Sequence, residues 1–308
     1  MAFTQLSPAQ IVRRLTERPT GPLPVVLDTD TANEVDDQFA LTWAALSGDT
    51  IDLQAVHVAP FYNEKSSSPA DGQDKSYLEA QGILAAIDRS DIPLLSGARE
   101  YLPDRHTPVD TPAARDLIQR ALARSTDDGP LYVATIGCLT NIASAILLEP
   151  QIVDSLVVAM LAGNDFDRGD AREFNLYQDV PAAQVVFESG VPIAHFGTLG
   201  LSIYLGLTYP EVQAYVGGCG QIGGILAGLY DAQCDLTPGS RRPIWDLAPV
   251  SWLIDPGFAE TKLVPRPRLT ACERWSPDPF GLPVLQATSL NTSGIFQDLF
   301  RKLARFRA

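Results

Sequence analysis

Basic residues are scarce in this sequence. The chain has 23 lysines and arginines against 37 aspartates and glutamates, which gives a formal net charge of -14. This excess of negative charge repels a phosphate backbone and argues against general nucleic-acid binding. The chain also lacks an uncharged apolar run of about 18 residues, so we expect no membrane span. Its first residues contain no apolar signal core, and we therefore expect a cytoplasmic protein.

Side chains that bind soft metals are also few. The four cysteines lie far apart without C-x-x-C spacing, and the chain has only three histidines. We therefore expect four reduced thiols packed as small apolar residues, and no zinc site.

Compact apolar runs alternate with helical patterns along most of the chain. The runs predict buried strands, and the amphipathic stretches between them predict helices. The predicted strands are 24–27, 53–59, 131–136, 155–162 and 191–196, and the predicted helices are 9–16, 38–47, 77–87, 139–148 and 180–189. This alternation predicts a Rossmann-like α/β fold, a mostly parallel sheet with helices on both faces. In such sheets the active cleft lies at the carboxyl ends of the strands.

Two stretches interrupt the alternation without marking a domain boundary. Residues 63–73 are polar and are expected to form a long loop. Residues 217–228 are rich in glycine but lack the G-x-G-x-x-G order after a strand, which argues against a dinucleotide site. We expect a single domain, 1–308, in which residues 1–22 form an N-terminal helix and connector.

Four aspartates lie within ten residues around the end of the first predicted strand. Asp28 and Asp30 close the strand, and Asp36 and Asp37 open the next helix. Carboxylates crowded in a partly dry cleft repel one another, and protonation, solvent or a bound cation relieves the repulsion. Ca²⁺ is a suitable cation because it takes about six to eight oxygen ligands. Alternatively, the second pair occupies a helix first turn capped by Asn33, but that leaves the first pair unexplained.

The run VVLDTDTANEVDDQFAL resembles the opening of the nucleoside hydrolases, the inosine-uridine preferring nucleoside hydrolase superfamily. Three later blocks are similar to that family in the same order. They are GCLTNIA at 137–143, EFNLY at 173–177, and Asp246 before a predicted helix in IWDLAPVSWLIDP. The resemblance extends from about residue 25 to residue 256 and covers most of the chain.

This resemblance implies a hydrolase that cleaves the N-glycosidic bond of ribonucleosides with a Ca²⁺-activated water. The implied metal ligands are Asp30, Asp37, Asp246 and the backbone carbonyl of Ile136. Asp30 is also implied as the catalytic general base. The family commonly forms dimers or tetramers, so a homo-oligomer is expected.

The same resemblance implies which side chains bind the nucleoside. Those expected to contact the ribose are Asp36, Asn63, Glu173, Asn175 and Asp246. Hydrolysis passes through a sugar with developing positive charge, which carboxylates placed in advance stabilise.

The sequence departs from the family pattern at three places. Five residues, rather than the usual three, separate Asp30 from Asp36, and Asp167 stands where the family usually has an asparagine, with Asn164 nearby. Trp245 replaces the histidine with which pyrimidine-accepting members protonate the departing base. Purine-preferring members carry a tryptophan there, and stacking contributes roughly 1–3 kcal/mol per base. We therefore expect a purine nucleoside stacked on Trp245, with a core tryptophan as the alternative.

The remaining aromatic and imidazole groups give weaker signals. His57 lies in a strand-like run and is expected to be a core residue. His106 and Tyr101, in a predicted loop, and His195, at the end of an apolar strand, are lesser candidates to reach the leaving base.

Two other functions remain open. The run VVLDTDT also fits a haloacid-dehalogenase-type phosphatase, with Asp28 as nucleophile and Asp30 as acid/base, but such a site needs a cation between its two acidic motifs. The second motif would be LAGNDFDRGD at 161–170, and the downstream half of the interval before it has arginines but no lysine beyond Lys75. The negative net charge also disfavours a phosphate ester. The second alternative is a non-catalytic nucleoside- or ribose-binding protein that retains the metal.

Overall fold

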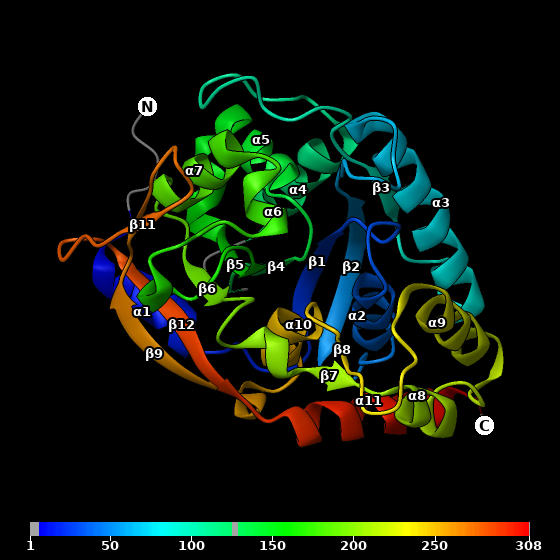
Figure 1. Ribbon diagram of the computed structural model, residues 1–308. Helices are drawn as coiled ribbons and strands as arrows, with labels where there is room; N and C mark the ends of the chain where they lie inside the picture. Colours follow the sequence, from blue (N-terminus) through cyan, green and yellow to red (C-terminus); the bar gives the residue numbers. More distant parts are fainter. Residues whose placement is uncertain (1–5, 125–128, 308) are drawn as a thin grey trace.

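An eight-stranded sheet forms the centre of the computed structural model, which describes residues 6–124 and 129–307 (Figure 1). Its strand order is β3-β2-β1-β4-β5-β6-β12-β9, and neighbours are parallel except for antiparallel β9 and β12. The strands are β1 (Leu23–Thr29), β2 (Ile51–Val58), β3 (Leu94–Ser96), β4 (Leu131–Thr135), β5 (Leu156–Leu161), β6 (Ile193–Phe196), β9 (Ala259–Pro265) and β12 (Pro283–Leu290). The predicted mostly parallel α/β fold is confirmed.

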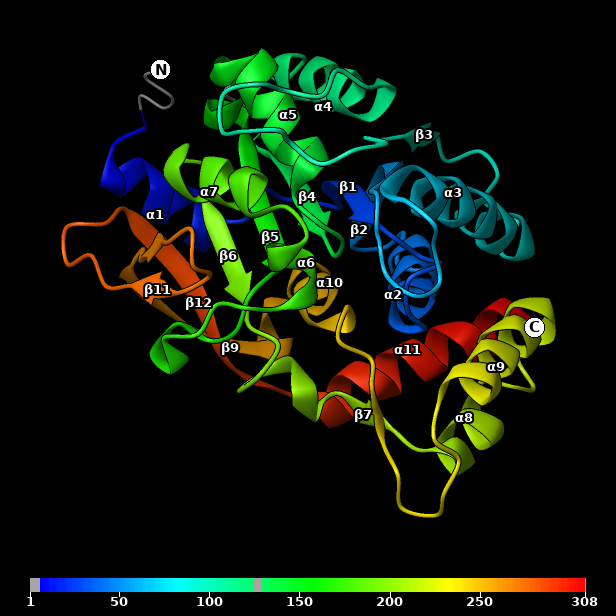
Figure 2. The same ribbon diagram turned by 45° about the horizontal axis from the view of Figure 1, so that its top comes forward.

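Helices cover both faces of this sheet (Figure 2). One face packs against α4 (Pro112–Leu122), α5 (Thr140–Leu148) and α7 (Val180–Glu188). The other packs against α1 (Pro8–Thr16), α2 (Asp36–Ala45), α10 (Leu247–Ile254) and α11 (Thr292–Arg307). Successive strand residues point to opposite faces of the sheet. Val26 therefore packs on the face covered by α4, α5 and α7, and Leu27 on the face covered by α1, α2, α10 and α11.

The remaining elements lie around the helices of this second face and near the ends of the strands. They are α3 (Pro69–Ala86), α6 (Phe174–Tyr177), α8 (Tyr209–Tyr215), α9 (Gly220–Gln233) and two short strand pairs, β7 (Gly206–Leu207) with β8 (Arg242–Pro243) and β10 (Arg268–Leu269) with β11 (Trp275–Ser276). Among the described residues, no helix combines the length and the apolar character needed to cross a membrane.

The strand order reverses between β1 and β4. The chain runs from β1 outward through β2 to β3 and then returns to β4, on the other side of β1. Ligands bind at such a switch point, beyond the carboxyl ends of the strands.

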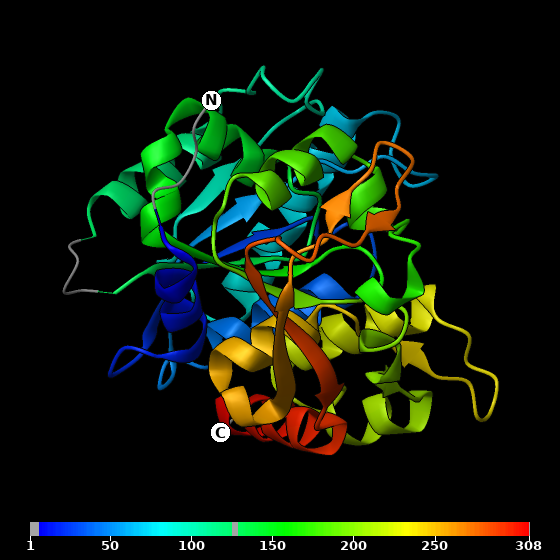
Figure 3. The same cartoon turned by 90° about the vertical axis from the view of Figure 1, so that its left-hand side faces the viewer.

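The fold differs from the predicted pattern in several places, and α4, α9 and α11 were not predicted. The predicted loop 63–73 ends early because α3 begins at Pro69, with the Ser68 hydroxyl accepting the Asp71 amide as its N-cap. The strands β9 and β12, which close one edge of the sheet, were not predicted (Figure 3). The predicted N-terminal helix is present as α1, and the first five residues of segment 1–22 lie outside the described residues.

Candidate active site

A cavity of about 280 Å³ opens at the carboxyl ends of four adjacent strands. Asp30 follows β1, Ile136 follows β4, Asn164 follows β5 and Thr198 follows β6, and all four line it. Most of the predicted site residues meet here, namely Asp30, Asp36, Asp37, Ile136, Glu173, Asn175, Trp245 and Asp246. The cleft therefore lies where the sheet topology places it.

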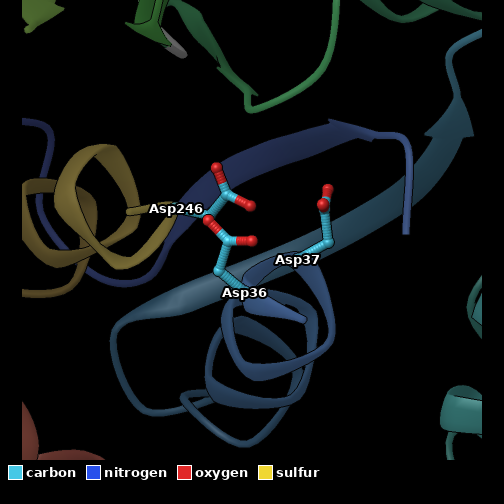
Figure 4. Close-up of side chains that lie close together, drawn as sticks. All are labelled: Asp36, Asp37 and Asp246. Atoms are coloured by element: carbon cyan, nitrogen blue, oxygen red, sulfur yellow. The ribbon is translucent and has the colours of Figure 1, made fainter. Parts of the chain in front are cut away.

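Three buried carboxylates gather on one side of the cavity. Asp36 and Asp37 are the first residues of α2, and Asp246 directly precedes α10. One oxygen from each lies within 4.8 Å of the others (Figure 4). Burial raises the pKa of Asp37 to about 7 and raises the pKa of Asp246 well above its ordinary value, and the charge of Asp36 raises that of Asp246 further.

Asp30 lies beside this cluster and is 1% exposed. Neither of its carboxylate oxygens has a hydrogen-bond partner among the described residues. Burial raises the pKa of Asp30 well above its ordinary value, and the charges of Asp37 and Asp36 add to this effect. Such a carboxylate needs either a proton or a cation, since a buried and unpaired charge is costly.

The start of α2 explains why the second aspartate pair points into the cavity. Asp36 and Asp37 do occupy the first turn of α2, as the alternative expected, but Val35 is at the N-cap position and makes no side-chain cap, so the prediction of Asn33 as the cap is wrong. Asp37 instead accepts the Thr29 hydroxyl at 2.5 Å and the Asp30 amide at 3.2 Å, which ties the helix start to the end of β1.

Asn63 is placed outside the cavity wall. Its side-chain amide donates to Asn33 Oδ1 at 2.7 Å, and Asn33 itself lines the cavity. Asn63 therefore reaches the site through Asn33.

Glu173 and Asn175 come from the turn that begins α6. Glu173 caps this helix, accepting the amides of Asn175 and Leu176 as well as the Gly163 amide at 2.8 Å. Burial raises the pKa of Glu173 to about 7 against these three hydrogen bonds. The side-chain amide of Asn175 donates through Nδ2 to the carbonyls of Ile136 at 2.8 Å and Leu161 at 3.0 Å.

Trp245 lines the cavity and is half-buried, with its ring also packed against the core. None of the three histidines lines the cavity. His57 is buried beside Asp116 at 2.8 Å, as predicted for a core residue, and His106 is exposed. His195 is buried and stacks on Phe166, with ring centroids 4.2 Å apart.

Several cavity residues were not predicted from the sequence. Asn164 lines the cavity, whereas Asp167, at the position of the family's asparagine, is exposed. Thr198 also lines it, and the only sequence signal was its place just after an apolar strand. Glu34, from the longer loop, lines the cavity and pairs with Arg242 at 2.6 Å.

Asp28 is not placed as a nucleophile. It is fully buried, does not line the cavity and accepts a hydrogen bond from Asn141 Nδ2 at 2.8 Å. Burial raises its pKa to about 8. This position disfavours the phosphatase alternative, in which Asp28 attacks the substrate.

The donor set fits a hard divalent cation. The cluster offers only oxygen atoms, and Asp30 Oδ1, Asp30 Oδ2 and Asp36 Oδ1 are buried without partners among the described residues. Divalent ions of the Ca²⁺ type prefer carboxylate and carbonyl oxygens, and Ile136, which lines the cavity, has a carbonyl oxygen that accepts one hydrogen bond, from Asn175.

Comparisons with known proteins agree with this geometry. Residues 25–269 match the model of the inosine-uridine preferring nucleoside hydrolase family. The pyrimidine-specific ribonucleoside hydrolase RihA of Enterobacter sp. (strain 638) is 26% identical over 268 residues, which cover 78% of this chain and 81% of that protein. RihA of Escherichia coli O81 (strain ED1a) is 24% identical over 282 residues, covering 82% of this chain and 83% of that protein.

Solved structures share the fold. The plant nucleoside hydrolase PpNRh1 superposes with a TM-score of 0.74 at 20% identity, covering 92% of this chain and 99% of that one. A purine-preferring ribonucleoside hydrolase from Gardnerella vaginalis gives 0.73 at 18% identity, covering 92% of this chain and 98% of that one. The chain thus belongs to the inosine-uridine preferring nucleoside hydrolase family and is a ribonucleoside hydrolase.

Proposed function

We propose that this enzyme hydrolyses purine ribonucleosides to free base and ribose with the help of one Ca²⁺ ion. The observation that carries the proposal is the group of buried carboxylates at the cavity wall, with ligand atoms within 4.8 Å of one another. A doubly charged cation relieves their repulsion, and a sugar diol can complete its oxygen ligands.

The proposed ligands are Asp30, Asp37, Asp246 and the Ile136 carbonyl. Asp36 belongs to the same cluster as Asp37 and Asp246, so it is either a further ligand or binds ribose beside the ion. When bound, Ca²⁺ would lower the pKa of a water molecule and polarise ribose hydroxyls. Asp30 would accept the proton from the attacking water, since both of its oxygens are free of other partners among the described residues.

The opposite wall would bind and orient the sugar. In the proposal Glu173 and Asn175 contact ribose hydroxyls, and Asn63 supports the site through Asn33. Their hydrogen bonds to the main chain hold both side chains in place before the substrate enters, which lowers the entropy lost on binding. The carboxylates facing the sugar would stabilise the positive charge that develops on it.

Trp245 supports a purine as the leaving base. Its half-buried ring offers a flat face at the cavity wall, and a two-ring base covers more of that face than a one-ring base. The cavity also offers no imidazole to protonate a pyrimidine. The curated relatives are named as pyrimidine-specific, so uridine is the competing substrate.

The decisive comparison is kcat/KM for inosine against uridine, measured on the Ca²⁺-loaded protein. A clear preference for inosine supports the proposal, and a preference for uridine contradicts the purine assignment. Tight binding of inosine by calorimetry without release of base favours a nucleoside-binding protein instead.

We also propose a homo-oligomer, a dimer or a tetramer, acting in the cytoplasm. The assembly rests on the family resemblance, and the location is supported by the cysteines, since none of the four, all within the described residues, forms a disulfide. Light scattering after size exclusion tests the assembly, and a monomer at assay concentration contradicts it.

A further inference from the structure

The turn that follows β5 is held from outside the cavity by two aromatic side chains. His195 Nε2 donates to the Ala162 carbonyl at 2.9 Å, and Trp275 Nε1 donates to the Asn164 carbonyl at 2.9 Å. Both carbonyls belong to buried residues, and both donors are buried side chains. Because a buried carbonyl that loses its donor is costly, the two N–H groups fix the position of this turn.

The inner side of the same turn holds the residues that face the cavity. The Gly163 amide donates to Glu173 Oε2 at 2.8 Å. Asn164 Nδ2 donates to the Arg172 carbonyl at 3.1 Å, and Asn164 Oδ1 accepts the Thr198 hydroxyl at 2.8 Å. A shift of the turn therefore moves Glu173 and Asn164 together.

The indole of Trp275 lies directly on the turn. A Cβ at Gly163 would come within 2.7 Å of Trp275 Cζ2, and Gly163 has a φ of +78°. Both features require glycine, since other residues rarely adopt this backbone conformation and would also clash with the ring. His195 fills the space behind, edge-on to Trp275 with ring centroids 5.9 Å apart.

The β10–β11 pair that carries Trp275 also supports the chain leading to Glu173 (Figure 3). The Trp275 amide donates to the Gly169 carbonyl at 3.0 Å, and the Ala171 amide donates to the Glu273 carbonyl at 2.9 Å. Residues 270–276 lie beyond the stretch that matches the family model, which ends at residue 269. This support thus comes from a part of the chain that the family model does not cover.

We propose that Trp275 is a positioning residue for substrate binding. Its indole N–H and ring hold the turn at Gly163 and Asn164, and through that turn they hold Glu173 where the ribose of the nucleoside binds. The inference rests on the proposed nucleoside hydrolase site. The proposed Ca²⁺ ligands come from the ends of β1 and β4 and the starts of α2 and α10, not from the turn after β5, so Trp275 acts on substrate binding and leaves the metal site unchanged.

The test is Trp275→Phe, which keeps an aromatic ring but removes the N–H donor. We expect KM for inosine to rise about tenfold, with kcat within about twofold and Ca²⁺ affinity unchanged. Trp43→Phe is the matched control. Trp43 is also buried, and its Nε1 donates to Asp298 at 2.8 Å; neither residue lines the cavity, so its loss should lower the melting temperature and leave KM unchanged.

A second variant covers the case in which Trp275→Phe does not fold. His195→Phe removes the other donor to the turn and should give the same rise in KM with little change in kcat. An unchanged KM in a folded Trp275→Phe or His195→Phe variant, or an equal rise in Trp43→Phe, overturns the inference.

A separate measurement distinguishes failure of this inference from failure of the proposed function. Hydrogen–deuterium exchange of the peptide that contains Gly163 needs no substrate. We expect faster exchange there in Trp275→Phe than in the wild type or Trp43→Phe, and equal protection in all three contradicts the inference. If the wild type hydrolyses no nucleoside, the proposed function is refuted but the inference on Trp275 is not. The exchange measurement then decides whether Trp275 holds the turn.

Discussion

Asn175 Nδ2 donates a hydrogen bond to the Ile136 carbonyl over 2.8 Å. One residue is a proposed ribose ligand and the other a proposed metal ligand, and they come from different sequence blocks. The carbonyl oxygen has a second lone pair, so it can accept this bond and still face a cation. The contact therefore lies where the sugar side of the cavity meets the metal side.

Replacing Trp245 should weaken the reaction with purines. Trp245→Ala removes the aromatic face, and a loss of roughly 1–3 kcal/mol in stacking corresponds to about a 5- to 150-fold fall in kcat/KM for inosine. Trp245→Phe keeps a smaller ring and should retain more of the activity. Steady-state kinetics with inosine and uridine measure both, and an unchanged kcat/KM in Trp245→Ala would show that Trp245 is only a core residue.

Asp28→Asn should be nearly neutral. A pKa of about 8 keeps the Asp28 carboxyl protonated at pH 7, and the neutral asparagine amide can still accept the hydrogen bond from Asn141. We expect Ca²⁺ affinity and inosine hydrolysis within about threefold of the wild type. If Asp28→Asn abolished turnover, Asp28 would have a chemical role, as the phosphatase alternative requires.

His195 should make the protein less stable in mild acid. Burial lowers its pKa to about 4, whereas an unfolded histidine titrates near 6.5, so between these values the unfolded chain binds more protons than the folded one. The free energy of unfolding should therefore fall as pH drops from about 7 towards 4, by up to about 3 kcal/mol from this group.

The measurement compares urea unfolding at pH 7 and pH 5 for the wild type and His195→Gln, which keeps a donor for the Ala162 carbonyl. The variant should lose less stability between the two pH values. His106→Gln, at an exposed histidine, is the control and should leave the dependence unchanged. An identical pH dependence in the wild type and His195→Gln would contradict this prediction.

The sheet and the acidic side of the cavity could be predicted from local signals. The strand ending at Asp28–Asp30 and the helix starting at Asp36 are short-range patterns, and the sheet rule then places them at one cleft. The burial of individual side chains and their hydrogen-bond partners could not be predicted from local patterns. Asn33, for example, fits a helix cap by position but binds Asn63 instead.

The other side of the cavity depends on contacts between distant residues. Asn164 lines the cavity and Asp167 does not, because the turn after β5 is folded back by Thr198 and Trp275 from later parts of the chain. The strands β9 and β12 were not predicted either. Their register is set by pairing with each other and with β6, across long stretches of sequence.

The central claim is that the buried carboxylates act by holding a cation against a nucleoside. It is tested most directly by stripping the protein with a chelator, adding back Ca²⁺ and following ribose and hypoxanthine release from inosine, in the wild type and Asp37→Ala. The account predicts one Ca²⁺ per wild-type chain with turnover rising as the site fills, and a loss of about 10³-fold or more in Asp37→Ala. Calcium-saturated wild type that releases no ribose, or Asp37→Ala with full activity, would contradict it.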